Sequence, residues 1–272
     1  MIQYLPVMMK SAVSAGIAAL DVYNQDFSVI EKADQSPLTL ADTRSHDIIS
    51  QALEPTDIPV LSEEGKDIAY EDRKDWEHLW IVDPLDGTKE FVKRNGEFTI
   101  NIALVENHIA VMGVIYVPVL ALLYFGAFDR GAHRVRIESP EAVKTDADID
   151  RLIDKADPLE VEIDAARPYK IVGSRSHLTP EVEAFVEEKR RVYGDVEFVS
   201  AGSSLKFCQI AEGKADIYPR LGPTMEWDTA AGQVIAETAG ARVYRHDTPE
   251  PLRYNKENLK NPWFVVTNGR DE

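Results

Sequence analysis

The segment from Trp80 to Phe91 constrains this chain most, because an apolar strand in it runs directly into two aspartates. Asp83 and Asp86 are three positions apart, with a proline between them and Gly87-Thr88 immediately after. Buried carboxylates at the end of a strand are costly unless they are paired or bind a cation. Proline fixes φ and glycine permits unusual backbone turns, so both carboxylates can converge on one point. Hard oxygen ligands on such a turn suit Mg²⁺.

The same residues are also typical of a surface turn, since Asp-Pro-x-Asp-Gly is a common β-turn composition. Two other segments favour the metal interpretation. Upstream, a short apolar strand over 59–62 ends in the adjacent carboxylates Glu63 and Glu64. Downstream, Asp228 stands where a helix of small residues begins. Three acidic motifs far apart in the sequence therefore offer the ligands for one cation site.

Together these motifs resemble the Mg²⁺-dependent, lithium-sensitive phosphatases of the inositol monophosphatase superfamily. The motifs are Glu-Glu at 63–64, Asp-Pro-Leu-Asp-Gly-Thr at 83–88 and Trp-Asp-Thr-Ala-Ala-Gly at 227–232. Further segments are most similar to the bacterial 3′(2′),5′-bisphosphate nucleotidases of that superfamily: Lys-Glu-Phe at 89–91, Arg-Asn-Gly-Glu-Phe-Thr at 94–99, Ser-Arg-Ser-His at 174–177 and Gly-Ser-Ser-Leu-Lys-Phe at 202–207. The likeness runs from Ser36 to Gly240 and covers nearly the whole chain.

Composition limits the partners and the compartment. The 272 residues carry a net charge of −17, which argues against non-specific binding to nucleic acid or to an anionic membrane surface. The single cysteine, Cys208, excludes an intrachain disulfide and fits a reducing compartment. No basic segment precedes the apolar N-terminus, Lys10 interrupts it, and no window approaches the about 20 apolar residues of a membrane span. We expect a cytoplasmic protein without an integral membrane segment; the resemblance alone suggests peripheral association with the inner face of the plasma membrane. The sequence does not give the oligomeric state.

Residue patterns predict an α/β (α+β) fold with two halves, 1–166 and 167–272. Helical spacing covers 3–23, and a second helix begins at Thr39 with Asp42 in a capping box. Alternation over 98–106, 109–117 and 120–128 predicts consecutive antiparallel strands. The acidic stretch 139–168 is interpreted as a surface excursion or a boundary between the halves.

After this stretch, helix-like and strand-like segments alternate, which is typical of an α/β layer. The segments are 170–174, 180–190, 196–200, 203–212, 215–219, 228–239, 241–245 and 264–267. The resemblance implies the layered α-β-α-β-α sandwich of the inositol monophosphatases, with an antiparallel N-terminal sheet and an α/β C-terminal half.

The resemblance also implies a ligand set for two or three Mg²⁺ ions. One ion would be held by Glu63, Asp83 and the carbonyl oxygen of Leu85, and a second by Asp83, Asp86 and Asp228. Such a two-metal clamp activates a water for in-line attack at one ion and stabilises the leaving oxygen at the other. An alternative role for Asp228 is the N-cap of the helix that follows it, and both roles can hold.

Thr88 and Asp42 are the expected activating pair, because a threonine hydroxyl oriented by a carboxylate can accept a proton from the attacking water. For Asp42 the alternative is a purely structural role in the capping box with Thr39. Glu64 would help to hold the water, or would be a solvated neighbour of Glu63.

The transferred phosphate is expected against the backbone N–H groups of Gly87 and Thr88. By resemblance, the nucleotide contacts are Ser174, His177, Gly202 and Lys206. Lys206 would meet a second, non-transferred phosphate at the start of its helix. The alternatives are an N-capping Ser203, a solvated Lys206 and an exposed His177. Lys89 and Arg94 are either cations at the rim of the site or ordinary surface charges.

The function implied by the resemblance is hydrolysis of the 3′-phosphate of adenosine 3′,5′-bisphosphate to give AMP and phosphate, in support of sulfate assimilation. One alternative is an inositol- or sugar-phosphate phosphatase with the same metal core. In that branch Asp-Gly-Thr is usually followed by Thr-Asn-Phe, whereas this chain has Lys-Glu-Phe at 89–91. Another alternative is a non-catalytic protein that binds divalent ions or nucleotides. The intact acidic set argues against it.

Overall fold

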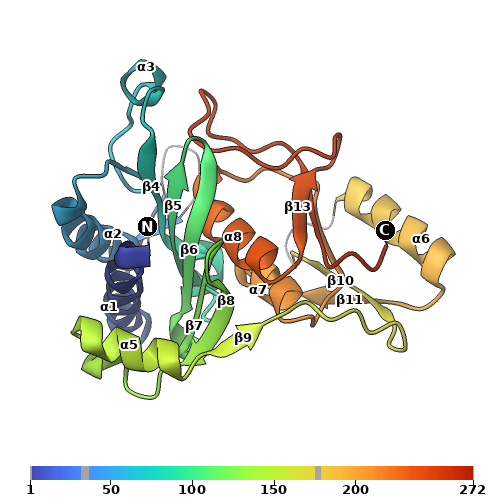
Figure 1. Ribbon diagram of the computed structural model, residues 1–272, viewed down its shortest axis with the longest axis horizontal. Helices are drawn as coiled ribbons and strands as arrows, with labels where there is room; N and C mark the ends of the chain where they lie inside the picture. The colour runs from blue at the N-terminus through green and yellow to red at the C-terminus, as the bar shows by residue number, and fades with distance from the viewer. Residues whose placement is uncertain (1, 32–36, 175–178, 272) are drawn as a thin grey trace.

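The computed structural model describes residues 2–31, 37–174 and 179–271. Two sheets alternate with three helical layers, as Figure 1 shows. Helices α1, α2 and α5 cover the outer face of the larger sheet, α7 and α8 lie between the two sheets, and α6 covers the outer face of the smaller sheet. This is the expected α-β-α-β-α arrangement.

The main helices are α1 (Leu5–Tyr23), α2 (Leu40–Leu53), α3 (Tyr70–Arg73), α4 (Thr88–Val92), α5 (Asp146–Asp154), α6 (Pro180–Tyr193), α7 (Leu205–Ala211) and α8 (Ala230–Thr238). A 3₁₀ turn, η5 (Glu226–Asp228), precedes α8.

The larger sheet has the strand order β3-β4-β5-β6-β7-β8-β9. Its strands are β3 (Val60–Ser62), β4 (His78–Asp86), β5 (Thr99–Glu106), β6 (Ile109–Val117), β7 (Leu122–Ala127), β8 (Gly131–Arg136) and β9 (Asp157–Leu159). β3 and β4 are parallel, and the remaining pairs are antiparallel. The three predicted antiparallel strands are therefore confirmed. Asn107 and His108 both have positive φ, as a two-residue hairpin turn between β5 and β6 requires.

The smaller sheet has the order β11-β10-β12-β14-β13. It consists of β10 (Tyr169–Gly173), β11 (Val196–Ser200), β12 (Ile217–Arg220), β13 (Arg242–Arg245) and β14 (Phe264–Thr267). A separate hairpin pairs β1 (Val29–Glu31) with β2 (Pro37–Thr39).

A shared core joins the two sheets. One cluster of buried side chains contains Ile81 from the larger sheet, Val172 from the smaller sheet, and Phe207 and Val234 from the helices between them. Alternate residues on β4 point to the other face, where Trp80 packs beneath α1 and α2. The chain passes from one sheet to the other between β9 and β10, close to the predicted boundary at 166–167. That the two halves are separate domains stays a prediction.

The stretch 139–168 contains more structure than an acidic surface excursion. It holds α5 and β9, and β9 pairs with β8 at the edge of the larger sheet. Ile149 is the one buried residue of α5 and packs in the core beneath α1. Of the two alternatives, the plain surface excursion is wrong, because Ile149, Leu152 and Ile153 pack in or against the core although they stand in a run of charges.

The helical segment Ile2–Tyr23 is long and apolar enough to cross a membrane, judged by length and composition only. The expectation that no window approaches a membrane span is therefore wrong on this measure. However, 56% of the window is buried inside the fold, and Met8, Met9 and Ala12 are fully enclosed against the larger sheet. A core helix passes the same test, so this helix is weak evidence for a membrane segment.

Close packing of α8 on β6 yields a stability prediction. A Cβ added at Gly113 would lie 2.4 Å from the backbone oxygen of Ala231, so Gly113→Ala should destabilise the protein by about 1–3 kcal/mol. Gly222→Ala is the control, because no described atom lies within 4 Å of its added Cβ. Chemical denaturation of both variants measures the difference. An unchanged midpoint for Gly113→Ala would contradict the close contact.

Candidate active site

The first acidic motif lies on a β-bulge at the end of β4. The pairing of β4 with β5 shifts register between Asp83, opposite Asn101, and Asp86, opposite Thr99. Asp83 is buried and its Oδ1 accepts a hydrogen bond of 3.1 Å from the amide of Leu85. Gly87 follows with φ of +90°, which lets the chain turn at once into α4. The bulge thus places both aspartates at the same end of the sheet.

Four predicted ligands share one electrostatic environment. Burial raises the pKa of Asp83 well above its usual range, and the charges of Glu63, Asp86 and Asp228 raise it further. Burial, followed by the charge of Asp86, raises the pKa of Asp228 to about 8. The amide of Glu63 bonds to Val82 on the adjacent strand, which fixes β3 beside β4. The structure therefore gathers the carboxylates that the three sequence motifs supply.

These carboxylates do not form a finished metal cage. In the described part of the chain, no three acidic, histidine or cysteine side chains are arranged to hold a metal ion. Their oxygens take other partners: Asp86 accepts from Ser204, and Asp228 accepts 2.9 Å from the amide of Met225. The donor set nevertheless fits a divalent cation, because it consists of hard oxygens, and burial and repulsion oppose the ionisation of Asp83 and Asp228 unless a cation is bound.

Asp228 does not cap the helix that follows it, so this alternative is wrong. α8 begins at Ala230 with Thr229 in the N-cap position. Asp228 instead ends the 3₁₀ turn η5, and its carboxylate closes that turn onto Met225. The turn presents Asp228 to the acidic cluster from the C-terminal half of the chain.

Asp42 serves both as a helix cap and as a partner of Thr88. Its Oδ2 accepts hydrogen bonds from the amide and hydroxyl of Thr39, at 2.7 and 2.6 Å, which confirms the capping box. Its Oδ1 accepts from the Thr88 hydroxyl at 3.1 Å. Burial raises the pKa of Asp42, against the lowering effect of Thr39, and the charge of Glu64 adds to the rise. The structure thus brings together all three expected catalytic residues.

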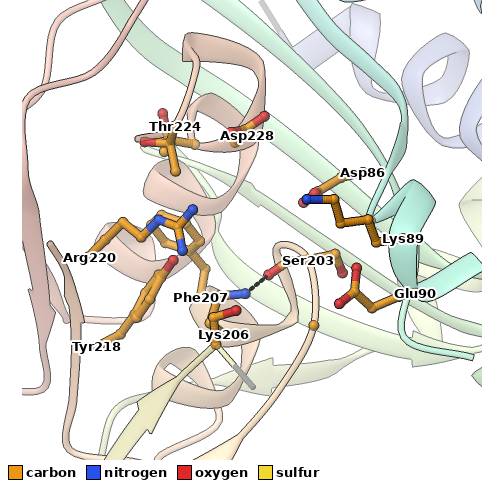
Figure 2. A pocket seen from close by; sticks show the side chains of 14 residues that line it. Asp86, Lys89, Glu90, Ser203, Lys206, Phe207, Tyr218, Arg220, Thr224 and Asp228 are labelled. Carbon is orange, nitrogen blue, oxygen red and sulfur yellow. Dashed lines mark hydrogen bonds between the residues drawn. The ribbon is translucent and has the colours of Figure 1, made fainter. Parts of the chain in front are cut away.

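A cavity of about 590 Å³, measured with the solvent at its mouth, opens beside this cluster (Figure 2). Six of the predicted site residues line it: Asp86, Gly87, Ser174, Gly202, Lys206 and Asp228. Lys89 also lines the cavity, as a cation at the rim would. Arg94 instead donates to the carbonyl oxygens of Tyr23 and Gln25 near the end of α1, which favours the alternative of an ordinary surface charge. His177 lies outside the described residues.

Lys206 is buried, so its interpretation as a solvated lysine is wrong. Its Nζ donates to the carbonyl oxygens of Ala201, at 3.3 Å, and Ser203, at 2.5 Å; Figure 2 shows the bond to Ser203. Burial lowers the pKa of Lys206 to about 8, although the charges of Asp86, Glu90 and Asp228 oppose the change. Because an ammonium group has three donors, one N–H remains for a ligand in the cavity.

The loop before α7 is tightly enclosed. The Gly202 amide donates 3.0 Å to Oε2 of Glu97, and a Cβ at Gly202 would lie within 2.9 Å of both Glu90 and Glu97. Ser203 has φ of +42°, and its buried hydroxyl has no hydrogen-bond partner among the described residues. Ser203 therefore does not cap α7, which begins at Leu205 after Ser204.

Arg220 is a third cation of the cavity, after Lys89 and Lys206, and the sequence interpretation missed it. It ends β12, and Tyr218 on the same strand lies between it and Lys206 (Figure 2). One guanidinium nitrogen donates 2.8 Å to Pro223, while the buried Nε has no partner within the described ranges. An arginine at the end of a buried strand, shortly before the Trp-Asp motif, was the available signal.

Comparison with known proteins agrees with a metal site at this position. The model of the inositol monophosphatase family matches residues 3–265. The chain belongs to the inositol monophosphatase family. Members of this family are metal-dependent phosphatases that generally use Mg²⁺. The acidic cluster lies where three separated segments of the family fold meet.

Individual relatives cover nearly the whole family fold. The chain is 43% identical over 260 residues to the 3′(2′),5′-bisphosphate nucleotidase CysQ of Shigella flexneri, covering 93% of this chain and 95% of the relative. The crystal structure of CysQ from Bacteroides thetaiotaomicron is 50% identical, with a TM-score of 0.87, and the match covers 98% and 97% of the two chains. Inositol monophosphatase from Anabaena, 24% identical with a TM-score of 0.72 over 98% and 91% of the chains, shares the fold.

A pH-dependent stability test follows from the raised carboxyl pKa values in this family member. A carboxyl group whose pKa is raised on folding destabilises the folded state more and more as pH rises between its two pKa values. For Asp228 these are 3.8 in the unfolded state and about 8 in the folded state. In chelator, the thermal unfolding midpoint should therefore fall between pH 5 and pH 8. Mg²⁺ should raise the midpoint more at pH 8 than at pH 5, because protons compete for the same oxygens.

Asp228→Asn separates this cluster from other titrating groups, such as Glu237, whose pKa burial raises to about 7. The variant should flatten both the pH dependence and the Mg²⁺ effect. A Mg²⁺ stabilisation that is the same at both pH values would contradict the assignment of these carboxylates as ligands.

Proposed function

We propose that this protein is a Mg²⁺-dependent 3′(2′),5′-bisphosphate nucleotidase that converts adenosine 3′,5′-bisphosphate to AMP and phosphate and so supports sulfate assimilation. The observation that carries the proposal is a cavity with two chemically distinct sides. In Figure 2, Asp86 and Asp228 lie on one side, together with Lys89, and the cations Lys206 and Arg220 lie on the other. Similarity to CysQ nucleotidases over nearly the whole chain supports the same activity.

The acidic side handles the phosphate that is cleaved. Glu63, Asp83 and the carbonyl oxygen of Leu85 would hold one Mg²⁺, and Asp83, Asp86 and Asp228 would hold another, with two or three ions in total. When bound, Mg²⁺ supplies positive charge that attracts the phosphate and favours attack by water. The amides of Gly87 and Thr88, at the tight turn into α4, orient the phosphate oxygens.

Thr88 and Asp42 direct the attacking water. The Thr88 hydroxyl donates a hydrogen bond to Asp42. Its oxygen lone pairs are therefore free to accept a hydrogen bond from that water. The carboxylate of Asp42 cannot rotate away, because its other oxygen is held by Thr39. Glu64 acts on this pair through its negative charge. The capping box thus keeps the activating pair in place.

The cationic side holds the phosphate that stays on the nucleotide. A chain with a net charge of −17 needs local positive charge to bind a bisphosphate, and Lys206 and Arg220 provide it within the cavity. Ser174 and Gly202 complete the wall on this side, and His177 stays a predicted nucleotide contact. Two cations beside an acidic cluster favour a substrate with two phosphates over a sugar or inositol monophosphate. The partner is therefore a small nucleotide, and the proposed location is the cytoplasm.

Asp83→Asn should nearly abolish phosphate release from adenosine 3′,5′-bisphosphate, because Asp83 is assigned to both ions. The fold should persist or gain stability, since one of four repelling carboxylates loses its charge. Asp154→Asn, on the exposed face of α5, is the control and should keep full activity. Assays with Mg²⁺ and with chelator should include inositol 1-phosphate and fructose 1,6-bisphosphate. Activity of Asp83→Asn within about tenfold of wild type, or ~1.4 kcal/mol in barrier, would sink the assignment.

Lys206→Met should weaken use of adenosine 3′,5′-bisphosphate much more than use of a substrate with one phosphate. Loss of a charged contact to the second phosphate should cost on the order of 1.5–3 kcal/mol, a tenfold or greater effect on kcat/KM. Methionine fills a similar volume, and Lys214→Met, which makes the same substitution at an exposed lysine just after α7, is the control. Equal losses on both substrates would show that Lys206 only supports the loop.

The wild-type enzyme should show a related pH signature. With a pKa of about 8, Lys206 is charged in about nine tenths of molecules at pH 7 and about a tenth at pH 9. The preference for the bisphosphate should therefore fall as pH rises through 8, and this fall should be missing in Lys206→Met.

A further inference from the structure

One buried hydroxyl connects the two halves of the acidic cluster. Ser204 lies immediately before α7 and is 2% exposed. Its Oγ is 2.7 Å from Oδ2 of Asp86, at the end of β4, and 3.0 Å from the backbone oxygen of Asp228, in η5. Asn101, on β5, donates to the same Oγ from Nδ2 at 2.9 Å. A single side chain therefore contacts three different elements of the site.

Ser204 occupies a helix N-cap position but does not act as a cap. A serine there normally accepts a hydrogen bond from one of the first helical amides. As far as the described residues go, the Ser204 side chain makes no such bond, and its hydroxyl points to Asp86 and Asp228 instead. The Ser204 side chain therefore does not stabilise the start of α7 and instead contacts two proposed metal ligands.

Asn101 shows the same bias toward the site. It is 1% exposed, and its Nδ2 donates to Ser204 and, at 3.4 Å, to Oδ2 of Asp86. Its Oδ1 is buried and has no partner among the residues that the structure describes. A buried amide that leaves its own oxygen unpaired is positioned for its donors, which hold the Ser204 hydroxyl against Asp86.

The hydrogen count gives this arrangement two states. Asn101 fills one acceptor position on Oγ, and the single hydroxyl proton goes to Asp86 or to the backbone oxygen of Asp228. The carboxylate is the closer and stronger acceptor when no cation is bound. When the Asp86 oxygens serve a cation, the backbone oxygen still accepts the proton, so no buried donor is left unpaired.

We propose that Ser204, held by Asn101, is a positioning residue that keeps Asp86 and Asp228 at a fixed separation and so sets the affinity for the Mg²⁺ they share. This inference rests on the proposed function. Asp86 ends β4 and Asp228 lies in η5, so repulsion between their ionised carboxylates would separate these two segments without a common anchor. The Ser204 hydroxyl lies within hydrogen-bond distance of both segments and can donate its one proton to either, which opposes this separation.

The experiment is a calorimetric Mg²⁺ titration of wild type and of Ser204→Ala without substrate. Loss of a hydrogen-bonding partner behind a metal ligand should weaken Mg²⁺ binding about tenfold. The Mg²⁺ concentration for half-maximal activity should rise by the same factor, while KM for the nucleotide at saturating Mg²⁺ stays unchanged. Ser204→Thr keeps the hydroxyl and should restore most of the affinity.

Ser11→Ala is the matched control, because Ser11 is also 2% exposed and donates to carbonyl oxygens, those of Val7 and Met8, within α1. It should keep wild-type Mg²⁺ affinity. If Ser204→Ala does not fold, Ser204→Cys takes its place, since a thiol has a similar size and donates only weakly.

Wild-type Mg²⁺ affinity in Ser204→Ala, or equal losses in Ser204→Ala and Ser11→Ala, would overturn the inference. Failure of the wild type to bind Mg²⁺ would overturn both this inference and the proposed function. Mg²⁺ binding by a wild-type protein that does not hydrolyse the bisphosphate would overturn the function alone, and the titration would still decide the role of Ser204.

Discussion

Repulsion among buried carboxylates is the constraint on which the rest of this structure depends. Asp83 is buried within the field of three other acidic groups, and burial is the largest cause of its raised pKa. Such a cluster opposes folding at neutral pH unless other contacts hold its parts together. Two buried polar networks supply these contacts, one for the acidic side of the cavity and one for the cationic side.

Glu226 anchors the acidic side. This carboxylate is fully buried and accepts from the amides of Asn255 and Lys256, at 2.6 and 3.0 Å, and from the Lys256 ammonium at 2.6 Å. Buried Arg73 holds the same loop from the N-terminal half, through Asn255 and the backbone. Because Glu226 and Asp228 share one 3₁₀ turn, the network fixes Asp228 against the half of the chain that carries Asp83.

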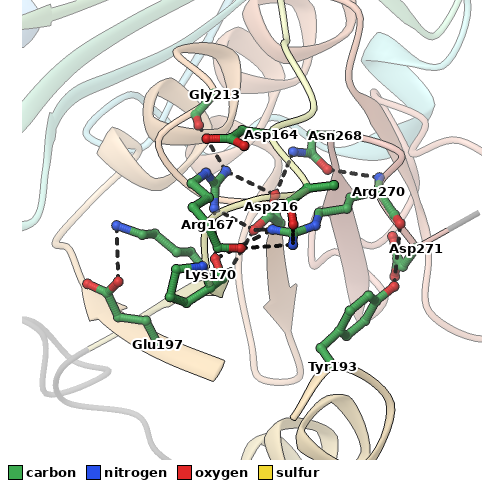
Figure 3. Close-up of polar contacts among 12 residues, drawn as sticks. Asp164, Arg167, Lys170, Tyr193, Glu197, Gly213, Asp216, Asn268, Arg270 and Asp271 are labelled. Carbon is green, nitrogen blue, oxygen red and sulfur yellow. Dashed lines mark hydrogen bonds and ion pairs between the residues drawn. The ribbon is translucent and has the colours of Figure 1, made fainter. Parts of the chain in front are cut away.

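Asp216 anchors the cationic side, as Figure 3 shows. It is fully buried. Its carboxylate accepts hydrogen bonds from the guanidinium groups of Arg167 and Arg270, from the side-chain amide of Asn268 and from the backbone amide of Lys170. β12 begins at the next residue and carries Arg220 at its end.

The acidic motifs, the Thr39 capping box and the main strands were predictable because each depends on residues close together in the sequence. Ser204, Arg220 and the burial of Lys206 were not, since they depend on contacts between distant segments.

The two sides of the cavity are also coupled to each other. Burial favours a neutral Lys206, whereas the charges of Asp86 and Asp228 favour the ammonium form, and the resulting pKa of about 8 leaves it charged at neutral pH. A cation on the acidic side would weaken that support, and a phosphate against Lys206 would replace it. Binding a bisphosphate together with its metal therefore keeps the charge of the whole cavity balanced, whereas either one alone would not. This balance gives a strongly acidic protein a physical reason to bind a polyanion only with its metal.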